Sequence, residues 1–331
     1  MNIKRKIEKI VFDDGSFIKT HLFTLKGDSV GDIEIETPSN SVDTTIEAII
    51  RSINIISEKF IPDKSLEKIF SVGIGVPGTI DSTNGKIIFA PNLKWSEIDF
   101  VDKLKKKINL SFSIENDANL AAIGEHWKGS ASGIDNFISI TVGTGIGGGI
   151  FVDGKLLTGV NHNSAEIGHM VINTGGLACN CGNYGCWEQY GSTSSLVRRV
   201  YNFIENDKNR SKIETYSKLI NLIDNDLDKI NGKLIVESAK MGDRLSQLEM
   251  DKMQYYLALG ISNLIFIFNP QLILLNGGIT RQGEWFISPI RKHVIKMVPK
   301  ISLKNFEILA GKLGNMAGAY GAAFIGLGKD Y

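Results

Sequence analysis

The chain lacks a strong charge of either sign, has few cysteines, and contains no long uninterrupted apolar run. Its formal net charge is +1 over 331 residues, which gives no argument for a nucleic acid or a membrane surface as its main partner. The longest apolar stretch, Leu257–Leu275, is interrupted by glycine, serine, asparagine and proline, so it predicts a buried helix followed by a strand. The basic N-terminus has no apolar core of signal-peptide length. These absences together predict a globular, cytoplasmic protein.

Only three cysteines are present, and all three lie close together. An odd number in one cluster argues against a disulfide framework and fits a reducing cytoplasm. Cys179, Cys181 and Cys186 follow His169 by ten to seventeen residues. Thiolates and imidazole are ligands that zinc prefers, and four protein ligands leave no open coordination position. The cluster therefore predicts a structural Zn²⁺ site, and the alternative is three free thiols in a loop.

Strands and helices alternate along the chain, which predicts an α/β fold with a mixed sheet. Predicted strands cover short alternating runs within residues 7–35 and then 70–76, 86–90, 112–114, 137–141, 272–275 and 306–309. Predicted helices cover 44–60, 96–108, 120–127, 250–268 and 284–296. Residues 192–243 read as helical and polar, and their sequence shows no recognisable chemistry.

The sequence ENDAN, residues 115–119, stands where a predicted strand gives way to a helix. Strand ends are where open α/β sheets expose their functional groups. Asn116 and Asp117 are therefore candidate site residues, although either could simply cap the following helix.

Two glycine-rich turns also follow predicted strands. In residues 143–149 successive glycines allow backbone N–H groups to face an anion such as phosphate, and Thr144 adds a hydroxyl donor. The same pattern is also typical of a tight β-turn. Gly277 and Gly278 form a second turn of this kind after the strand at 272–275.

Taken together, several stretches resemble the ROK family of sugar kinases and sugar-responsive repressors. They are VGIGVPGTID (72–81), APNLKW (90–95), ENDAN, TVGTGIGGGI (141–150), EIGH, CNCGNYGCWE, LNGGI (275–279) and the small-residue segment GNMAGAYGAA. The resemblance implies a two-lobed actin-like/hsp70-like ATPase (ribonuclease H-like) fold with a central cleft. It places residues 1–117 and 313–331 in a small lobe and 118–312 in a large lobe, and it implies a homodimer or a dimer of dimers.

The resemblance also implies roles for individual residues. Asp117 resembles the catalytic base that takes a proton from a sugar hydroxyl as it attacks the γ-phosphate of ATP bound with Mg²⁺. His169 would hold zinc with one ring nitrogen and face the sugar with the other. The sugar-binding set would be Gly78, Asn92, Asn116, Asp117, Glu166, His169 and Glu188. The nucleotide would meet Thr144 and Gly145 at its phosphates and Gly277 and Gly278 at its adenosine.

The first phosphate loop departs from the family pattern, which reads approximately Asp-Ile-Gly-Gly-Thr. Here it is Phe12-Asp13-Asp14-Gly15-Ser16. Asp13, Gly15 and Ser16 take the phosphate-binding roles if one residue is deleted; without a gap, a carboxylate faces the triphosphate. Two like charges ~4 Å apart repel by about 4 kcal/mol at an effective dielectric of 20 unless Mg²⁺ lies between them.

Two main functional hypotheses follow. One is a kinase that phosphorylates a hexose or N-acetylhexosamine, glucose and N-acetylmannosamine being equally compatible. The other is a sugar-binding protein or sensor that has lost phosphate transfer. Repressors of the family carry a helix-turn-helix domain before the first strand, whereas only about ten residues precede it here. A zinc-dependent interaction module without a ligand site is a third hypothesis.

Overall fold

The computed structural model describes residues 6–13, 17–38, 41–62, 64, 66–207 and 211–328. Gly15 and Ser16 of the predicted phosphate loop lie outside the described residues, and Asp13 is described only as the last residue of strand β1. The chain divides into two compact units. Unit 1 comprises Met1–Asn136, Gly149–Ala165 and Asn315–Tyr331, and unit 2 comprises Phe137–Gly148 and Glu166–Gly314.

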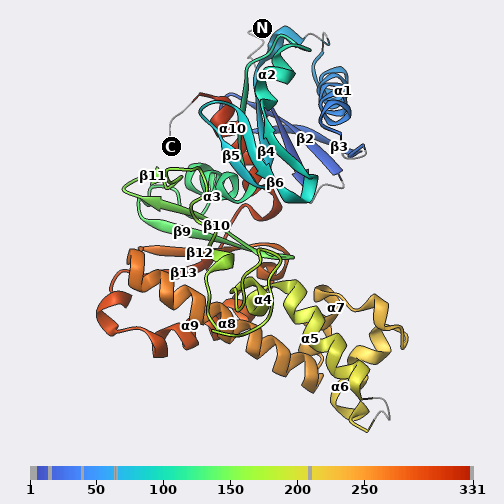
Figure 1. The fold of residues 1–331 in the computed structure, drawn as a ribbon, viewed down its shortest axis with the longest axis vertical. Helices are drawn as coiled ribbons and strands as arrows, with labels where there is room; N and C mark the ends of the chain where they lie inside the picture. The colour runs from blue at the N-terminus through green and yellow to red at the C-terminus, as the bar shows by residue number, and fades with distance from the viewer. Residues whose placement is uncertain are drawn as a thin grey trace. The chain divides into compact units, whose positions relative to one another are not determined.

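Unit 1 is built on a mixed five-stranded sheet with the order β3-β2-β1-β4-β8, of which β2, β3 and β4 are labelled in Figure 1. Strands β1, β2 and β3 form an antiparallel meander, and β4 and β8 continue the sheet in parallel with β1. Their bounds are Lys6–Asp13, Phe17–Thr24, Ser29–Glu36, Ile69–Val76 and Phe112–Asn116. A smaller antiparallel sheet contains β5 (Thr79–Asp81), β6 (Lys86–Ala90) and β7 (Trp95–Ile98).

The apolar residues of helix α1 (Val42–Phe60) recur at helical spacing, and Ile46, Ile49, Ile53 and Ile56 are fully buried. They join residues of β2, β4, β8 and of α2 (Phe100–Lys105) in one hydrophobic core. This core is what fixes the strand ends that carry the candidate site residues.

Helices α3 (Asp117–Lys128) and α10 (Ala317–Gly326) pack closely against each other in unit 1. A side chain at Gly321 would lie 1.9 Å from the carbonyl oxygen of Leu120, and one at Gly124 would lie 2.0 Å from that of Ala317. The small residues of the C-terminal segment therefore serve helix packing. This packing places α3 in unit 1, whereas the predicted lobe boundary at residues 117/118 would assign it to the other lobe.

The second five-stranded sheet has the order β11-β10-β9-β12-β13, which repeats the order of the first sheet. Strands β9 (Phe137–Val142), β12 (Leu272–Asn276) and β13 (Glu307–Ala310) are parallel and belong to unit 2. Strand β10 (Ile146–Val152) begins in unit 2, and its last residues pair with β11 (Lys155–Leu156) in unit 1.

The remaining helices belong to unit 2, where α8 packs against α9. Their bounds are α4 (Glu188–Gly191), α5 (Thr193–Asn206), α6 (Ile213–Leu222), α7 (Gly232–Lys240), α8 (Arg244–Phe268) and α9 (Glu284–Met297). Among the described residues, no helix is both long enough and apolar enough to cross a lipid bilayer.

The predicted mixed α/β class is confirmed, but the helix predicted over residues 96–108 is partly wrong. Trp95–Ile98 pairs with β6 as a strand, and only Phe100–Lys105 is helical. Lys94 and Glu97 have positive φ angles, which interrupt a helix, and Trp95 is buried by its place in the sheet. Tertiary pairing thus overrode a local pattern that suits a helix.

Candidate active site and metal centre

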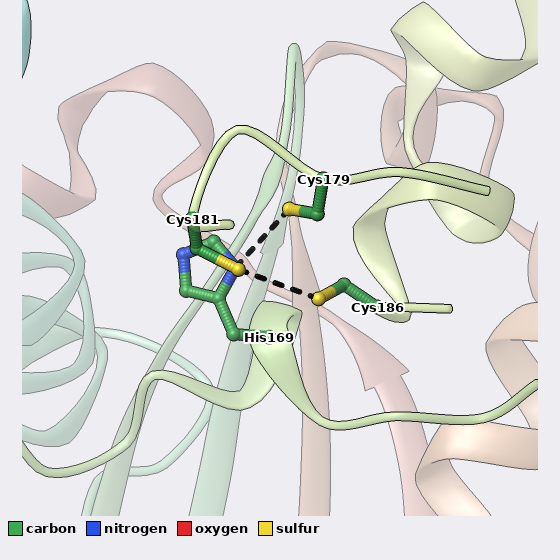
Figure 2. A group of neighbouring side chains, drawn as sticks. All are labelled: His169, Cys179, Cys181 and Cys186. Atoms are coloured by element: carbon green, nitrogen blue, oxygen red, sulfur yellow. Dashed lines mark hydrogen bonds between the residues drawn. The ribbon is translucent and has the colours of Figure 1, made fainter. Parts of the chain in front are cut away.

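The imidazole of His169 and the three cysteine thiols converge on one point of unit 2 (Figure 2). One ligand atom from each of the four side chains lies within 4.8 Å of the other three. The Cys181 and Cys186 sulfurs are 3.6 Å apart, as are the Cys179 sulfur and His169 Nδ1. Two sulfurs bound tetrahedrally to one zinc, each at 2.3 Å, lie about 3.8 Å apart. The four side chains therefore fit a Zn²⁺ ion, and the sulfurs are too far apart for a disulfide.

Backbone hydrogen bonds shape the loop that carries the cysteines. Cys179 N–H donates to the Asn183 carbonyl at 2.8 Å, and Gly182 N–H donates back to the Cys179 carbonyl at 3.0 Å. Gly185 has a positive φ, and a side chain there would lie 1.9 Å from the Asn173 carbonyl oxygen. Tyr190 closes the loop from the following helix, because its hydroxyl accepts the Leu177 N–H at 2.7 Å. The loop is thus a tight turn that brings the three thiols close together.

Two carboxylates adjoin His169. Glu188 Oε1 lies 3.8 Å from His169 Nδ1 and accepts a hydrogen bond of 3.1 Å from the Cys179 thiol. Glu166 Oε2 lies 4.0 Å from the other ring nitrogen, Nε2. Because Nδ1 faces the thiols, Nε2 is left facing the side of the ring on which Glu166 lies. The structure therefore brings the three unit 2 members of the predicted sugar set together beside the cysteine cluster.

Burial changes the acidity of several of these groups. It raises the pKa of the Cys186 thiol to about 12, with further contributions from the neighbouring thiols. The pKa of Cys181 is lowered, first by the backbone N–H of Asn183. Burial also raises the pKa of Glu166; the nearby His169 opposes this shift and Glu188 adds to it. Clustered, partly desolvated carboxyl and thiol groups of this kind are typical of functional sites.

The glycine-rich turn before β10 lies directly against Glu188. A side chain at Gly145 would approach Glu188 Oε2 to 2.6 Å, so only glycine leaves room for this carboxylate. On the other side of the turn, the Gly143 carbonyl accepts the N–H of Thr193 at 2.8 Å, which ties the turn to the start of α5. The predicted phosphate turn is therefore packed between a predicted sugar ligand and a helix.

A cavity of ≈ 930 Å³ opens beside this turn within unit 2. Its walls are the Gly143–Thr144 turn, helices α5 and α7, and the short helix from Gly278 to Gln282. Apolar side chains such as Tyr201 and Ile230 share the lining with the cations Arg198, Lys233 and Arg281. Its size and mixed lining suit a ligand of nucleotide size. Residues 192–243, whose sequence suggested no chemistry, supply much of this wall.

In unit 1 the ENDAN segment is organised by the buried carboxylate of Glu115. Its oxygens accept hydrogen bonds from Ser82 Oγ at 2.6 Å, from Asn116 N–H at 2.7 Å and from Asn119 Nδ2 at 3.1 Å. The residue is only 2% exposed. A buried carboxyl group with several donors holds its neighbours in place, because a hydrogen bond lost there is not replaced by one to bulk water. Sequence reasoning did not single out Glu115, since only its burial and its remote partner Ser82 reveal this role.

Asn116 and Asp117 stand at the junction of β8 and α3. The Asn116 side-chain oxygen caps α3 by accepting the N–H groups of Ala118 and Asn119 at 2.8 and 3.1 Å, and its amide donates to the Gly78 carbonyl at 2.9 Å. Asp117 is exposed, and its Oδ1 accepts the Ala118 N–H at 2.9 Å. Asn92 is also exposed, in the short helix Pro91–Leu93. The helix-capping interpretation of Asn116 is confirmed, and the same side chain is hydrogen-bonded to Gly78, another residue of the predicted sugar set.

The predicted site residues accordingly form groups within each unit. Unit 1 carries Gly78, Asn92, Asn116 and Asp117, and unit 2 carries Glu166, His169 and Glu188 with the cysteines. Among the predicted nucleotide ligands, Thr144 and Gly278 line the cavity, Gly145 lies in the adjoining turn, and Gly277 precedes Gly278 at the end of β12.

A sequence model described as the ROK family matches residues 15–328 of this chain. The chain is 34% identical to a glucokinase of Thermotoga maritima over 291 residues, covering 87% of this chain and 88% of the relative. It is also 32% identical to the xylose repressor of Bacillus subtilis over 310 residues, covering 93% of this chain and 74% of the repressor.

Among solved structures, a ROK family glucokinase from Streptomyces griseus in complex with glucose and AMPPNP matches with a TM-score of 0.82 and 31% identity. The match covers 98% of this chain and 100% of the other. A ROK family transcriptional regulator, a homologue of the E. coli MLC protein, gives a TM-score of 0.84 at 23% identity, covering 98% and 78% of the two chains. These likenesses confirm the predicted actin-like ATPase fold class.

Proposed function

Because the chain belongs to the ROK family, we propose that it is a sugar kinase that transfers the γ-phosphate of ATP to a hydroxyl of a hexose or N-acetylhexosamine. Two relatives support the proposal. One is a glucokinase at 34% identity, and the other is a glucokinase of the same fold whose structure was solved in complex with glucose and AMPPNP. The observation that carries the proposal is the ENDAN geometry, in which an exposed Asp117 follows an Asn116 anchored to Gly78.

Asp117 acts as the general base in this proposal. It accepts the proton of the sugar hydroxyl as the hydroxyl oxygen attacks the γ-phosphorus and ADP leaves. Phosphoryl transfer depends mostly on alignment and charge neutralisation, so one carboxylate near the attacking oxygen is the main chemical group that the protein must supply. Mg²⁺ bound with ATP neutralises the charge of the phosphates.

The sugar hydroxyls are bound by carboxylate, amide and imidazole groups. The proposed ligands are Gly78, Asn92, Asn116, Glu166, His169 and Glu188. Carboxylates accept hydrogen bonds from adjacent hydroxyls, and a site built on such groups rejects analogues that lack a hydroxyl. His169 serves both sites, because Nδ1 faces the thiols while Nε2 faces the side of Glu166.

A structural Zn²⁺ held by His169, Cys179, Cys181 and Cys186 would fix the tautomer and direction of the imidazole. With four protein ligands the ion has no open position for a substrate. Its contribution is to hold the loop 166–188 in shape.

ATP is bound at the cavity of unit 2. Thr144, Gly145 and the backbone of their turn face the phosphates, and Gly277 and Gly278 lie against the adenosine. Apolar groups such as Tyr201 suit the base, and the cations Lys233 and Arg281 suit an anionic ligand. Asp13, Gly15 and Ser16 of the first loop stay further candidate phosphate ligands in this proposal.

A coupled assay that detects ADP, run with glucose, N-acetylmannosamine and related hexoses, tests the proposal. Turnover of at least one sugar that depends on ATP is the expected result. The second candidate is a sugar-binding protein without phosphate transfer, favoured by the altered loop at residues 12–16 and by the 32% identity to xylose repressors. Measurable sugar binding by calorimetry without any ADP formation would decide for that candidate.

A further inference from the structure

The side chain of Gln189 lies between the metal cluster and the nucleotide cavity. Its amide nitrogen approaches the Cys179 sulfur at 3.7 Å and Glu188 Oε1 at 3.5 Å. Its oxygen Oε1 accepts a hydrogen bond of 3.1 Å from Arg198 Nη1, and its backbone carbonyl accepts one of 2.6 Å from Arg198 Nη2. One residue therefore connects a predicted zinc ligand, a predicted sugar ligand and a cation on the cavity wall.

Arg198 determines which way the Gln189 amide points. A guanidinium group only donates hydrogen bonds, so the amide oxygen must face Arg198 and the NH₂ group must face the sulfur and the carboxylate. Arg198 donates hydrogen bonds to both the side-chain oxygen and the backbone carbonyl of Gln189. Its planar guanidinium group therefore also holds the residue in one position.

A zinc ion in the cluster would give this amide a role. In the structure the Cys179 thiol and Glu188 Oε1 are 3.1 Å apart. A sulfur that binds zinc accepts hydrogen bonds and does not donate them, so Cys179 and Glu188 Oε1 would then present two acceptors to each other. His169 Nδ1 also lies against both groups, but it would be committed to the metal, which leaves the Gln189 Nε2 group as a hydrogen-bond donor facing both of them.

We infer that Gln189 is a positioning residue, held by Arg198, whose amide steadies the zinc-bound Cys179 thiolate and orients Glu188 toward the sugar. The inference rests on the proposed function only for the sugar, since the contact with the metal cluster is independent of phosphate transfer. Hydrogen-bond partners of metal ligands typically change metal affinity or activity by about 10–100-fold when removed.

Two variants of Gln189 test the inference. Gln189→Met keeps the length and packing of the side chain but removes both polar groups, so a merely space-filling role predicts wild-type behaviour. Gln189→Glu keeps an acceptor for Arg198 but replaces the NH₂ donor with an oxygen. Arg198→Met removes the anchor. Lys233→Met is the matched control, because it removes another cation of the same cavity wall, on α7.

The first measurement is the rate of zinc release from the loaded protein to an excess of a chromogenic chelator. We expect about tenfold faster release from both Gln189 variants and from Arg198→Met, and a wild-type rate from Lys233→Met. Thermal unfolding of each variant confirms that it is folded. A wild-type protein that binds no zinc, or a Gln189→Met protein that releases zinc at the wild-type rate, would overturn the inference.

The second measurement is the affinity for glucose and for N-acetylmannosamine by calorimetry, without ATP. We expect weaker binding to Gln189→Met of whichever sugar the wild type binds, and in turnover a raised sugar KM with little change in kcat. Unchanged sugar affinity would overturn the inference that Gln189 orients Glu188 toward the sugar. If the wild type bound sugar but formed no ADP, the kinase proposal alone would fail, because both measurements on Gln189 stand without catalysis.

Discussion

The side-chain amide of Asn116 donates a hydrogen bond of 2.9 Å to the backbone carbonyl of Gly78. These two residues are 38 positions apart in the chain, and both belong to the predicted sugar site. The carbonyl oxygen of the same Asn116 side chain caps helix α3. One side chain thus joins the start of the ENDAN helix to the turn after β4.

The two functions of Asn116 can be separated by substitution. Asn116→Asp keeps an oxygen for the helix cap but loses the donor to Gly78, so we expect near wild-type stability with weakened sugar binding. Asn116→Ala loses both, and loss of the cap costs a further ~1 kcal/mol of stability. Thermal unfolding and calorimetric sugar titration of both variants give the comparison. Equal sugar affinity in Asn116→Asp and the wild type would exclude a role for this hydrogen bond in the site.

Replacing the proposed base should abolish turnover while sparing substrate binding. We expect Asp117→Asn to lower kcat by about 10²–10⁴-fold, because the amide cannot accept the hydroxyl proton. Sugar affinity should change little, since Asn preserves the shape of the side chain. Asp43→Asn, an exposed acid in the first turn of α1, is the control. An Asp117→Asn protein with normal kcat would show that another group is the base.

A side chain at Gly145 should displace the Glu188 carboxylate and weaken sugar binding. The β-carbon of Gly145→Ala would lie 2.6 Å from Glu188 Oε2 and would displace that carboxylate. Loss of a hydrogen bond to a charged group costs about 1.5–3 kcal/mol, so we expect sugar affinity to fall roughly ten- to hundredfold. Gly143→Ala, two residues earlier, meets nothing within 4 Å and should leave sugar affinity near the wild-type value. Similar effects of both substitutions would argue that Glu188 is not the cause.

Removal of the metal should loosen the loop that carries His169 and weaken sugar binding. The loop between residues 166 and 188 contains little regular secondary structure. Two isolated β-bridges are found in it, one between Val171 and Cys186 and one between Ala178 and Tyr184. We expect faster amide hydrogen exchange over residues 166–190 after chelation, reversed by added zinc. Unchanged sugar affinity in the stripped protein would refute the scaffold role of the metal.

Zinc affinity should rise with pH. Burial raises the pKa of the Cys186 thiol to about 12, so this thiol is protonated near neutrality and must lose its proton to bind the metal. Raising the pH lowers the cost of that loss, and apparent affinity should therefore increase from about pH 6 to 8. Calorimetry in two buffers of different ionisation enthalpy counts the released protons. Binding without proton release would contradict ligation by these thiols.

Much of the fold follows from local sequence. The isoleucine spacing of α1, the apolar runs of β4, β9 and β12, and the proline after α8 each constrain one element through neighbours a few residues away. The cysteine spacing likewise predicted the cluster that the structure assembles, because all four side chains lie within one short loop. Where a strand partner decided the outcome, as at Trp95–Ile98, the local pattern indicated a helix and was wrong.

By itself the sequence determined which residues are available for chemistry: ENDAN, the glycine turns, and the loop of His169 and the cysteines. Only the tertiary structure showed what holds them. The buried Glu115 accepts a hydrogen bond from Ser82, which lies 33 residues away in the chain. Helices α5 and α7 form walls of the cavity, and Arg198 orients the side chain of Gln189. The physical reason is that a motif records short-range geometry, whereas burial and hydrogen bonding between distant residues arise only when the chain has folded.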